Sequence, residues 1–118
     1  MYRVNKNDFE RRMSLLLGAL RETEESWRTA TMPSTYPEAI FVLGQFAEYK
    51  KTTKREWVKE RKGLVALYSN IQTKLKTYGL QPWEPRDGLR LEDLEREWTA
   101  FLGSEASRSR AINARIRE

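Results

Sequence analysis

Apolar side chains recur at alternating steps of four and three residues through the first thirty positions. The stripe starts at Phe9, includes Met13 and ends at Trp27. Such alternation keeps one face of an α-helix turned toward a partner. Because Pro33 disfavours helical geometry in the residue before it, the pattern predicts a helix over about 5–30.

The next segment opens with a helix-start signal. Thr35 followed three residues later by Glu38 forms a capping box, and Pro37 falls in the first turn, where its missing N–H is not needed. The alternation of three and four then continues without interruption. We therefore expect a second helix over about 36–78.

The middle of this second stripe is polar, because Lys50, Lys54 and Arg61 occupy positions that should face a partner. A single helix over 36–78 would also be about 65 Å long, whereas its partners would reach only about 39–44 Å. An unbroken helix would overhang both of them. We therefore expect a break or kink near 51–55.

A long loop and a third helix complete the pattern. Two prolines and two glycines lie between 79 and 88, so this stretch cannot be helical throughout. A third apolar stripe begins at Leu91 and weakens after Gly103. Acidic residues gather at its start and arginines near its end, as the helix dipole favours. The predicted helix covers about 90–118.

Three amphipathic helices bury their stripes most simply as an antiparallel, left-handed three-helix bundle. The predicted fold is all-α, and a length of 118 residues suits one domain over 1–118. The core residues expected from the stripes are Phe9, Met13, Leu16, Leu20, Trp27, Ile40, Leu43, Trp57, Leu64, Ile71, Leu75, Leu94, Trp98 and Ile112.

Composition argues against most catalytic chemistry. The chain has neither Cys nor His, which removes thiolate nucleophiles, disulfides and the commonest general base and metal ligand. The carboxylates between 92 and 97 point in different directions on a helix and are flanked by Arg90 and Arg96, which favours a charge-paired, solvated face. The longest apolar stretch, 15–20, is far short of a membrane span. We expect a soluble, non-enzymatic chain with no cofactor, metal or small-molecule substrate.

The strongest polar feature is basic. Seven Lys or Arg and two Glu lie between positions 50 and 62, a local balance of +5 that equals the net charge of the chain. This charge suits nucleic acid or an anionic membrane. A solvated helix face is the favoured interpretation, since no aromatic platform accompanies the charge, and nucleic acid is not the expected partner. The candidate partner surface consists of Lys50, Lys51, Lys54, Arg55, Lys59, Arg61 and Lys62.

Three segments carry a family resemblance: PEAIFVLGQFAEYK at 37–50, IQTKL at 71–75 and RDGLRLEDLEREW at 86–98. They resemble the start of the second helix of a spectrin repeat, the stretch before its second loop, and a third-helix start with a core tryptophan at Trp98. The chain is most similar to the first rod repeat of alpha-actinin and beta-spectrin, which follows their actin-binding calponin-homology domains. Plakin repeats are similar over the same stretch. One departure is Ala19, which replaces a tryptophan common in the first helix of the family.

The resemblance implies a non-catalytic rod or spacer repeat of an actin cross-linking protein in the cytoplasmic cytoskeleton. Such a repeat would give length and stiffness. Its implied partners are neighbouring repeats of the same chain and a second full-length rod in an antiparallel homodimer, while actin would be bound through other domains. The alternative from a different class is a basic helical module that binds nucleic acid or anionic membrane through 50–62.

Overall fold

The computed structural model describes residues 2–117, and the side chains of residues 6–116. All its regular structure is helical over these residues. The predicted all-α, antiparallel three-helix bundle is confirmed, with the middle helix divided in two as expected. The four segments are α1 (Tyr2–Thr29), α2 (Tyr36–Lys51), α3 (Thr53–Thr77) and α4 (Leu91–Arg117).

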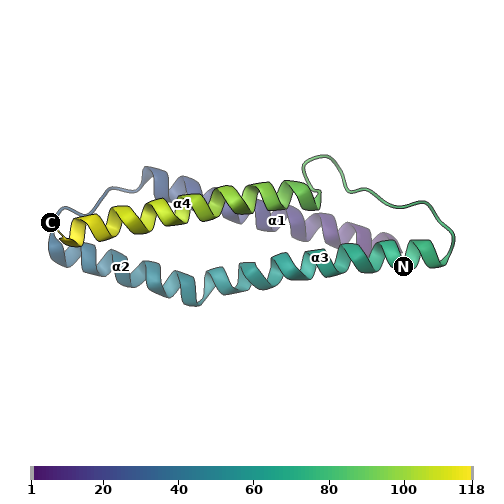
Figure 1. Cartoon of the computed structure of the whole chain (residues 1–118), viewed down its shortest axis with the longest axis horizontal. Helices are drawn as coiled ribbons and strands as arrows, with labels where there is room; N and C mark the ends of the chain where they lie inside the picture. The colour runs from purple at the N-terminus through teal and green to yellow at the C-terminus, as the bar shows by residue number, and fades with distance from the viewer. Residues whose placement is uncertain (1, 118) are drawn as a thin grey trace.

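The bundle is slender, with principal extents of 63 × 23 × 17 Å. In Figure 1, α1 runs in one direction, α2 and α3 return along the whole long axis, and α4 runs beside them in the direction of α1. The helix α1 packs against α3 and α4, whereas α2 packs against α4 and its own continuation α3. The two ends of the middle helix therefore have different neighbours.

The start of α2 follows from its capping residues. The hydroxyl of Thr35 accepts a hydrogen bond from the Glu38 amide at 3.4 Å. The Glu38 carboxylate in turn accepts from the backbone amide of Ser34 at 3.0 Å and from its hydroxyl at 3.2 Å. These donors lower the pKa of Glu38. The capping box is present, but its carboxylate reaches one residue further back than the usual pattern.

Most of the predicted core is buried. Ten of the expected residues lie inside: Phe9, Met13, Leu16, Leu20, Leu64, Ile71, Leu75, Leu94, Trp98 and Ile112. Trp27, Leu43 and Trp57 are partly buried. Outside the predicted set, Leu17, Ala39, Phe46 and Phe101 are also buried.

The core prediction was wrong at Ile40, whose side chain is 43% exposed. In α2 the inward positions are Ala39 and Phe46, which lie two turns apart on the face toward α4. Ile40 follows Ala39 by one residue, about 100° further around the helix, so it points away from that face. With few neighbours around α2, this rotation of the stripe leaves Ile40 in solvent.

The loop after α3 packs onto the bundle through Trp83. The Gln72 side chain holds this residue at both backbone groups, accepting from the Trp83 amide at 3.0 Å and donating to its carbonyl. The indole then lies edge-on to Phe9, with ring centroids 5.5 Å apart. Gly79 and Gly88 adopt positive φ values of 68° and 90° at the two ends of the loop, a conformation that favours glycine. This loop runs along the end of the bundle that α4 does not reach, where it lies beside α1 and α3.

Candidate functional site

The break in the middle helix is centred on Thr52, within the predicted stretch. Its backbone has φ −112° and ψ −76°, and the two helical segments are bent by 29°. The Thr52 amide and hydroxyl both donate to the carbonyl of Glu48, at 3.0 and 2.8 Å. A threonine hydroxyl that bonds to the carbonyl four residues back is a known cause of helix bending. The segments still extend over the whole bundle, so the break bends the middle helix but does not shorten it.

Five aromatic rings from all four helices meet beside this break. Trp27 of α1 stacks on Phe101 of α4, with centroids 5.4 Å apart, and contacts Tyr49 of α2 edge-on at 5.5 Å. Trp57 of α3 lies 5.8 Å from Tyr49 and 5.5 Å from Phe101. Phe46 completes the cluster, 5.6 Å from Trp27. Such edge and stacked pairs add to the energy of burial, so the cluster holds the break in a fixed place.

A buried carboxylate on α4 links the two sides of the break. Glu105 is only 8% exposed, and it accepts a hydrogen bond from the Tyr49 hydroxyl of α2 at 3.0 Å. Its other oxygen accepts from the ammonium of Lys54 in α3 at 2.5 Å. Burial and the Glu105 carboxylate raise the pKa of Tyr49, so the phenol stays protonated and remains a donor. Removing either partner of such a pair leaves a poorly solvated charge, so the pair favours the arrangement of helices that keeps both groups together.

A second ion pair joins α3 to α4 two turns further along. The guanidinium of Arg61 donates to both oxygens of Glu95, at 3.0 and 2.7 Å. It also lies over the Trp98 ring, 5.5 Å from its centroid. Because a bidentate pair fixes both position and orientation, this contact aligns the two helices beyond the aromatic cluster.

The interface of α1 with α4 contains two carboxylates that face each other, Glu24 and Glu97. Burial and the nearby Glu97 charge raise the pKa of Glu24. One Glu24 oxygen, Oε1, is buried and accepts no hydrogen bond among the described residues. Arg21 lies 3.7 Å from Glu97 and compensates part of its charge. This is a place where the bundle carries an unfavourable polar contact at neutral pH.

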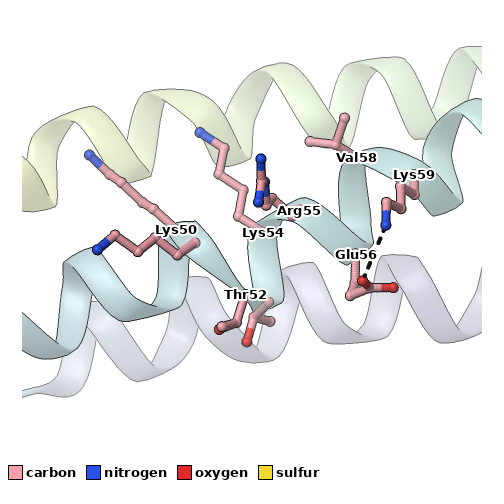
Figure 2. Close-up of a pocket in the computed structure, with 9 residues that line it drawn as sticks. Lys50, Thr52, Lys54, Arg55, Glu56, Val58 and Lys59 are labelled. Atoms are coloured by element: carbon pink, nitrogen blue, oxygen red, sulfur yellow. Dashed lines mark ion pairs between the residues drawn. The ribbon is translucent and has the colours of Figure 1, made fainter.

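The structure divides the seven predicted partner-surface residues into two groups. Lys54 and Arg61 are used inside the molecule, in the ion pairs to α4 described above. Their charges are therefore already matched by carboxylates, and their place on an external partner surface stays a prediction. The exposed group comprises Lys50, Lys51, Arg55, Lys59 and Lys62. Figure 2 shows that Lys50, Lys54 and Arg55 extend to one side of the break, while Thr52 and Glu56 point to the other.

Sequence reasoning missed Glu105, although a signal for it exists. The stripe of α4 proceeds from Leu94 through Trp98 and Phe101 by steps of four and three, and the next step of four reaches Glu105. An acidic residue at that position complements Lys54, the basic residue on the facing stripe. Matching the polar stripe positions of different helices by charge is therefore the signal that points to this contact.

Neither a cluster of metal-ligand side chains nor a membrane-spanning helix occurs in the described part of the chain. Among the residues that the structure describes, no group of three or more Cys, His, Asp or Glu side chains could hold a metal ion. Over the same range, no helix is long and apolar enough to cross a membrane. The interactions of the site are hydrogen bonds, ion pairs and ring contacts between helices.

Comparison with known proteins finds three relatives along almost the whole chain. Alpha-actinin-like protein 1 of Schizosaccharomyces pombe is 45% identical over 113 residues, which is 96% of this chain and 18% of that protein. The human spectrin beta chain, non-erythrocytic 5, is 25% identical over 94% of this chain and 3% of its own length. Alpha-actinin A of Dictyostelium discoideum is 23% identical over 95% of this chain and 13% of its own. No family model matches the chain. The chain thus spans less than a fifth of each relative.

Proposed function

Because the chain is a spectrin repeat of the alpha-actinin and spectrin type, we propose that it serves as a non-catalytic rod module of an actin cross-linking protein. The observation that carries this proposal is the 45% identity to an alpha-actinin-like protein over nearly the whole chain. The module supplies length and stiffness, and its work is mechanical. The cytoplasmic cytoskeleton is the location that fits this role.

The shape of the bundle supports a spacer. The molecule is 63 Å long and much narrower across, so one module adds a rod-like element. In Figure 1 the beginning of α1 and the end of α4 lie toward opposite ends of the long axis. In a row of modules with this arrangement, one neighbour would join at each end of the long axis, so that each repeat contacts only its neighbours.

Lateral ties between the helices support stiffness. Arg12 of α1 binds Glu60 of α3 through two hydrogen bonds, at 3.1 and 2.5 Å. Lys54 and Glu105 tie α3 to α4 near the break. Sliding one helix along another would break these ties before the apolar core separated. A load along the axis would therefore be resisted by the whole bundle.

Actin binding and dimerisation belong to the longer protein in this proposal. Actin would be bound through other domains, neighbouring repeats would continue the rod, and two full-length rods would associate in antiparallel fashion. The names of the relatives, alpha-actinin and spectrin, support this assignment.

A chimera tests the rod role. The segment of the S. pombe alpha-actinin-like protein that aligns with this chain would be replaced by this chain or, as a control, by a flexible Gly-Ser linker with the same number of residues. Electron microscopy would then measure the spacing of actin filaments in bundles. We expect the chain to preserve a regular spacing and the linker to make it shorter and irregular, because flexible linkers behave as random coils. Equal spacing with both inserts would contradict the proposal.

A further inference from the structure

A shallow groove lies on the basic side of the break in the middle helix. It has a volume of about 910 Å³ and is lined by residues of α2 and α3 on both sides of Thr52, all between positions 50 and 59. Val58 supplies an apolar surface at its α3 end, and five of its lining residues are Lys or Arg. The lining contains one carboxylate, Glu56.

Much of this positive charge has no carboxylate partner. Within the described part of the chain, neither Lys51 nor Arg55 forms an ion pair, and both are exposed. Lys50 lies over the ring of Phe46, 4.8 Å from its centroid. Among the same residues, its ammonium group forms no ion pair with a carboxylate. The one carboxylate of the lining, Glu56, lies 3.7 Å from Lys59.

The bend brings these charges together on one side. Figure 2 shows the side chains of Lys50 and Arg55 extending to the same side of the ribbon, whereas Glu56 points to the opposite side. An unbroken helix would space residues 50 and 55 by about 7.5 Å along its axis, so a ligand that contacts both needs anionic groups at more than one point. An arginine fork matches the oxygens of a phosphate, and lysine ammonium groups add point charges.

We propose that this groove binds a compact polyphosphate, meaning two or more neighbouring phosphate esters on one small group. Soluble inositol polyphosphates and phosphoinositide headgroups both carry such neighbouring phosphate esters. The groove is short, and none of its lining side chains is aromatic. A nucleic acid strand would call for a longer row of cations and for rings on which bases stack, so the compact ligand is favoured.

The bound anion would join α2 to α3. It would contact Lys50 and Lys51 on one side of Thr52 and Arg55 on the other, so it would hold the bend in addition to the contacts that Glu105 makes with Tyr49 and Lys54. Because such a ligand binds the folded chain and not the unfolded one, it would raise the thermal midpoint. This inference is independent of the rod function.

The test uses the whole chain, inositol hexakisphosphate as the soluble probe, and phosphatidylcholine vesicles with or without phosphatidylinositol bisphosphate. Titration calorimetry should show salt-sensitive binding of the soluble probe. In the double variant Lys51→Glu, Arg55→Glu the affinity should fall by at least about tenfold, as expected for the loss of charge-assisted contacts. The matched control is Lys74→Glu, Lys76→Glu, an equal change of charge at exposed positions near the other end of α3. It should retain most of the affinity.

Each outcome decides for or against the groove. If the unmodified chain binds both the soluble probe and the vesicles, and the groove variant binds neither, the site is supported and its ligand is a lipid headgroup. If the unmodified chain binds only the soluble probe, and the groove variant loses that binding, the site is supported and its ligand is a soluble polyphosphate. An equal loss in the groove and control variants overturns the site, because the effect would then follow net charge alone. Absence of binding by the unmodified chain also overturns it. The proposal would also be overturned if the chain bound an oligonucleotide more tightly than inositol hexakisphosphate at equal phosphate concentration. The groove would then be a nucleic acid surface. Circular dichroism would establish that both variants are folded.

Discussion

The two halves of the middle helix, α2 and α3, carry the same alternation of apolar positions but are buried to different extents. Three residues of α3, Leu64, Ile71 and Leu75, are buried in the main core. In α2 the buried residues are Ala39 and Phe46, while Phe41 is 66% exposed. The difference follows from the neighbours: α3 lies against α1, α4 and the loop, but α2 lies mainly against α4. A stripe therefore marks the face available for packing, and the number of partners decides how much of it is buried.

The means of attachment differ as well. The α3 half is held largely by aliphatic burial, whereas the α2 half is held by aromatic rings and by the hydrogen bond from Tyr49 to Glu105. Regions with few buried apolar contacts open at lower free energy than the core. We therefore expect α2 to be the less stable half.

The largest expected effect is at the α3 core. Leu64→Ala should lower the free energy of unfolding by about 2–5 kcal/mol, because it removes a fully buried side chain from the cluster. Urea denaturation would measure the change. The control is Val65→Ala, an exposed neighbour on the same helix, which should change stability by less than about 1 kcal/mol. Similar losses for the two variants would contradict the assigned burial.

The next effect concerns the buried carboxylate. Glu105→Leu should cost about 1–3 kcal/mol, since it leaves the Lys54 ammonium and the Tyr49 hydroxyl without their acceptor. Adding Lys54→Met should recover part of this loss, because an apolar pair can replace a buried ion pair. A double-mutant cycle from thermal or urea melts measures the coupling. Strictly additive effects would show that the two side chains do not interact.

A smaller effect is expected away from the break, between α1 and α4. The raised pKa of Glu24 means that its charged form is disfavoured in the folded chain, so this group lowers stability as pH rises through its ordinary range near 4.5. Glu24→Gln should therefore raise the thermal midpoint at pH 7, and the gain should vanish as pH falls below that range. A gain that is independent of pH would contradict this origin. Melting curves from pH 3.5 to 7 would measure it.

The smallest effect is expected on the outer face of α2. Phe41→Ser should change the free energy of unfolding by less than about 1 kcal/mol, because the ring is mostly in solvent. Phe46→Ser on the inner face of the same helix should cost several times more, since Phe46 contacts Trp27 and Tyr49. Chemical denaturation compares the two. A large loss at Phe41 would indicate that α2 has a partner on its outer face.

Much of the fold could be predicted because it depends on local signals. The capping residues at Thr35 and Glu38 and the apolar stripes predict the helices and most of the core. The break was also predicted, but from helix length, whereas its local cause is the Thr52 hydroxyl bonded to the Glu48 carbonyl. Ile40 was misplaced because the rotation of α2 depends on contacts with α4.

The site was harder to predict because it depends on pairing between helices. Lys54 and Arg61 were identified as charges on an apolar stripe, but their partners Glu105 and Glu95 lie on a different helix, 51 and 34 residues away. A single sequence states which faces are polar and does not state which faces meet. Charge complementarity between stripes is the physical signal that connects them.

Hydrogen exchange on the unmodified chain tests the central claim most directly, namely that aliphatic burial stabilises α3 more than the ties to α4 stabilise α2. At neutral pH, backbone amides between Leu64 and Leu75 should exchange at least about tenfold more slowly than those between Ala39 and Phe46, because α2 opens at a lower free energy. Equal protection in the two halves, or slower exchange in α2, would contradict this account.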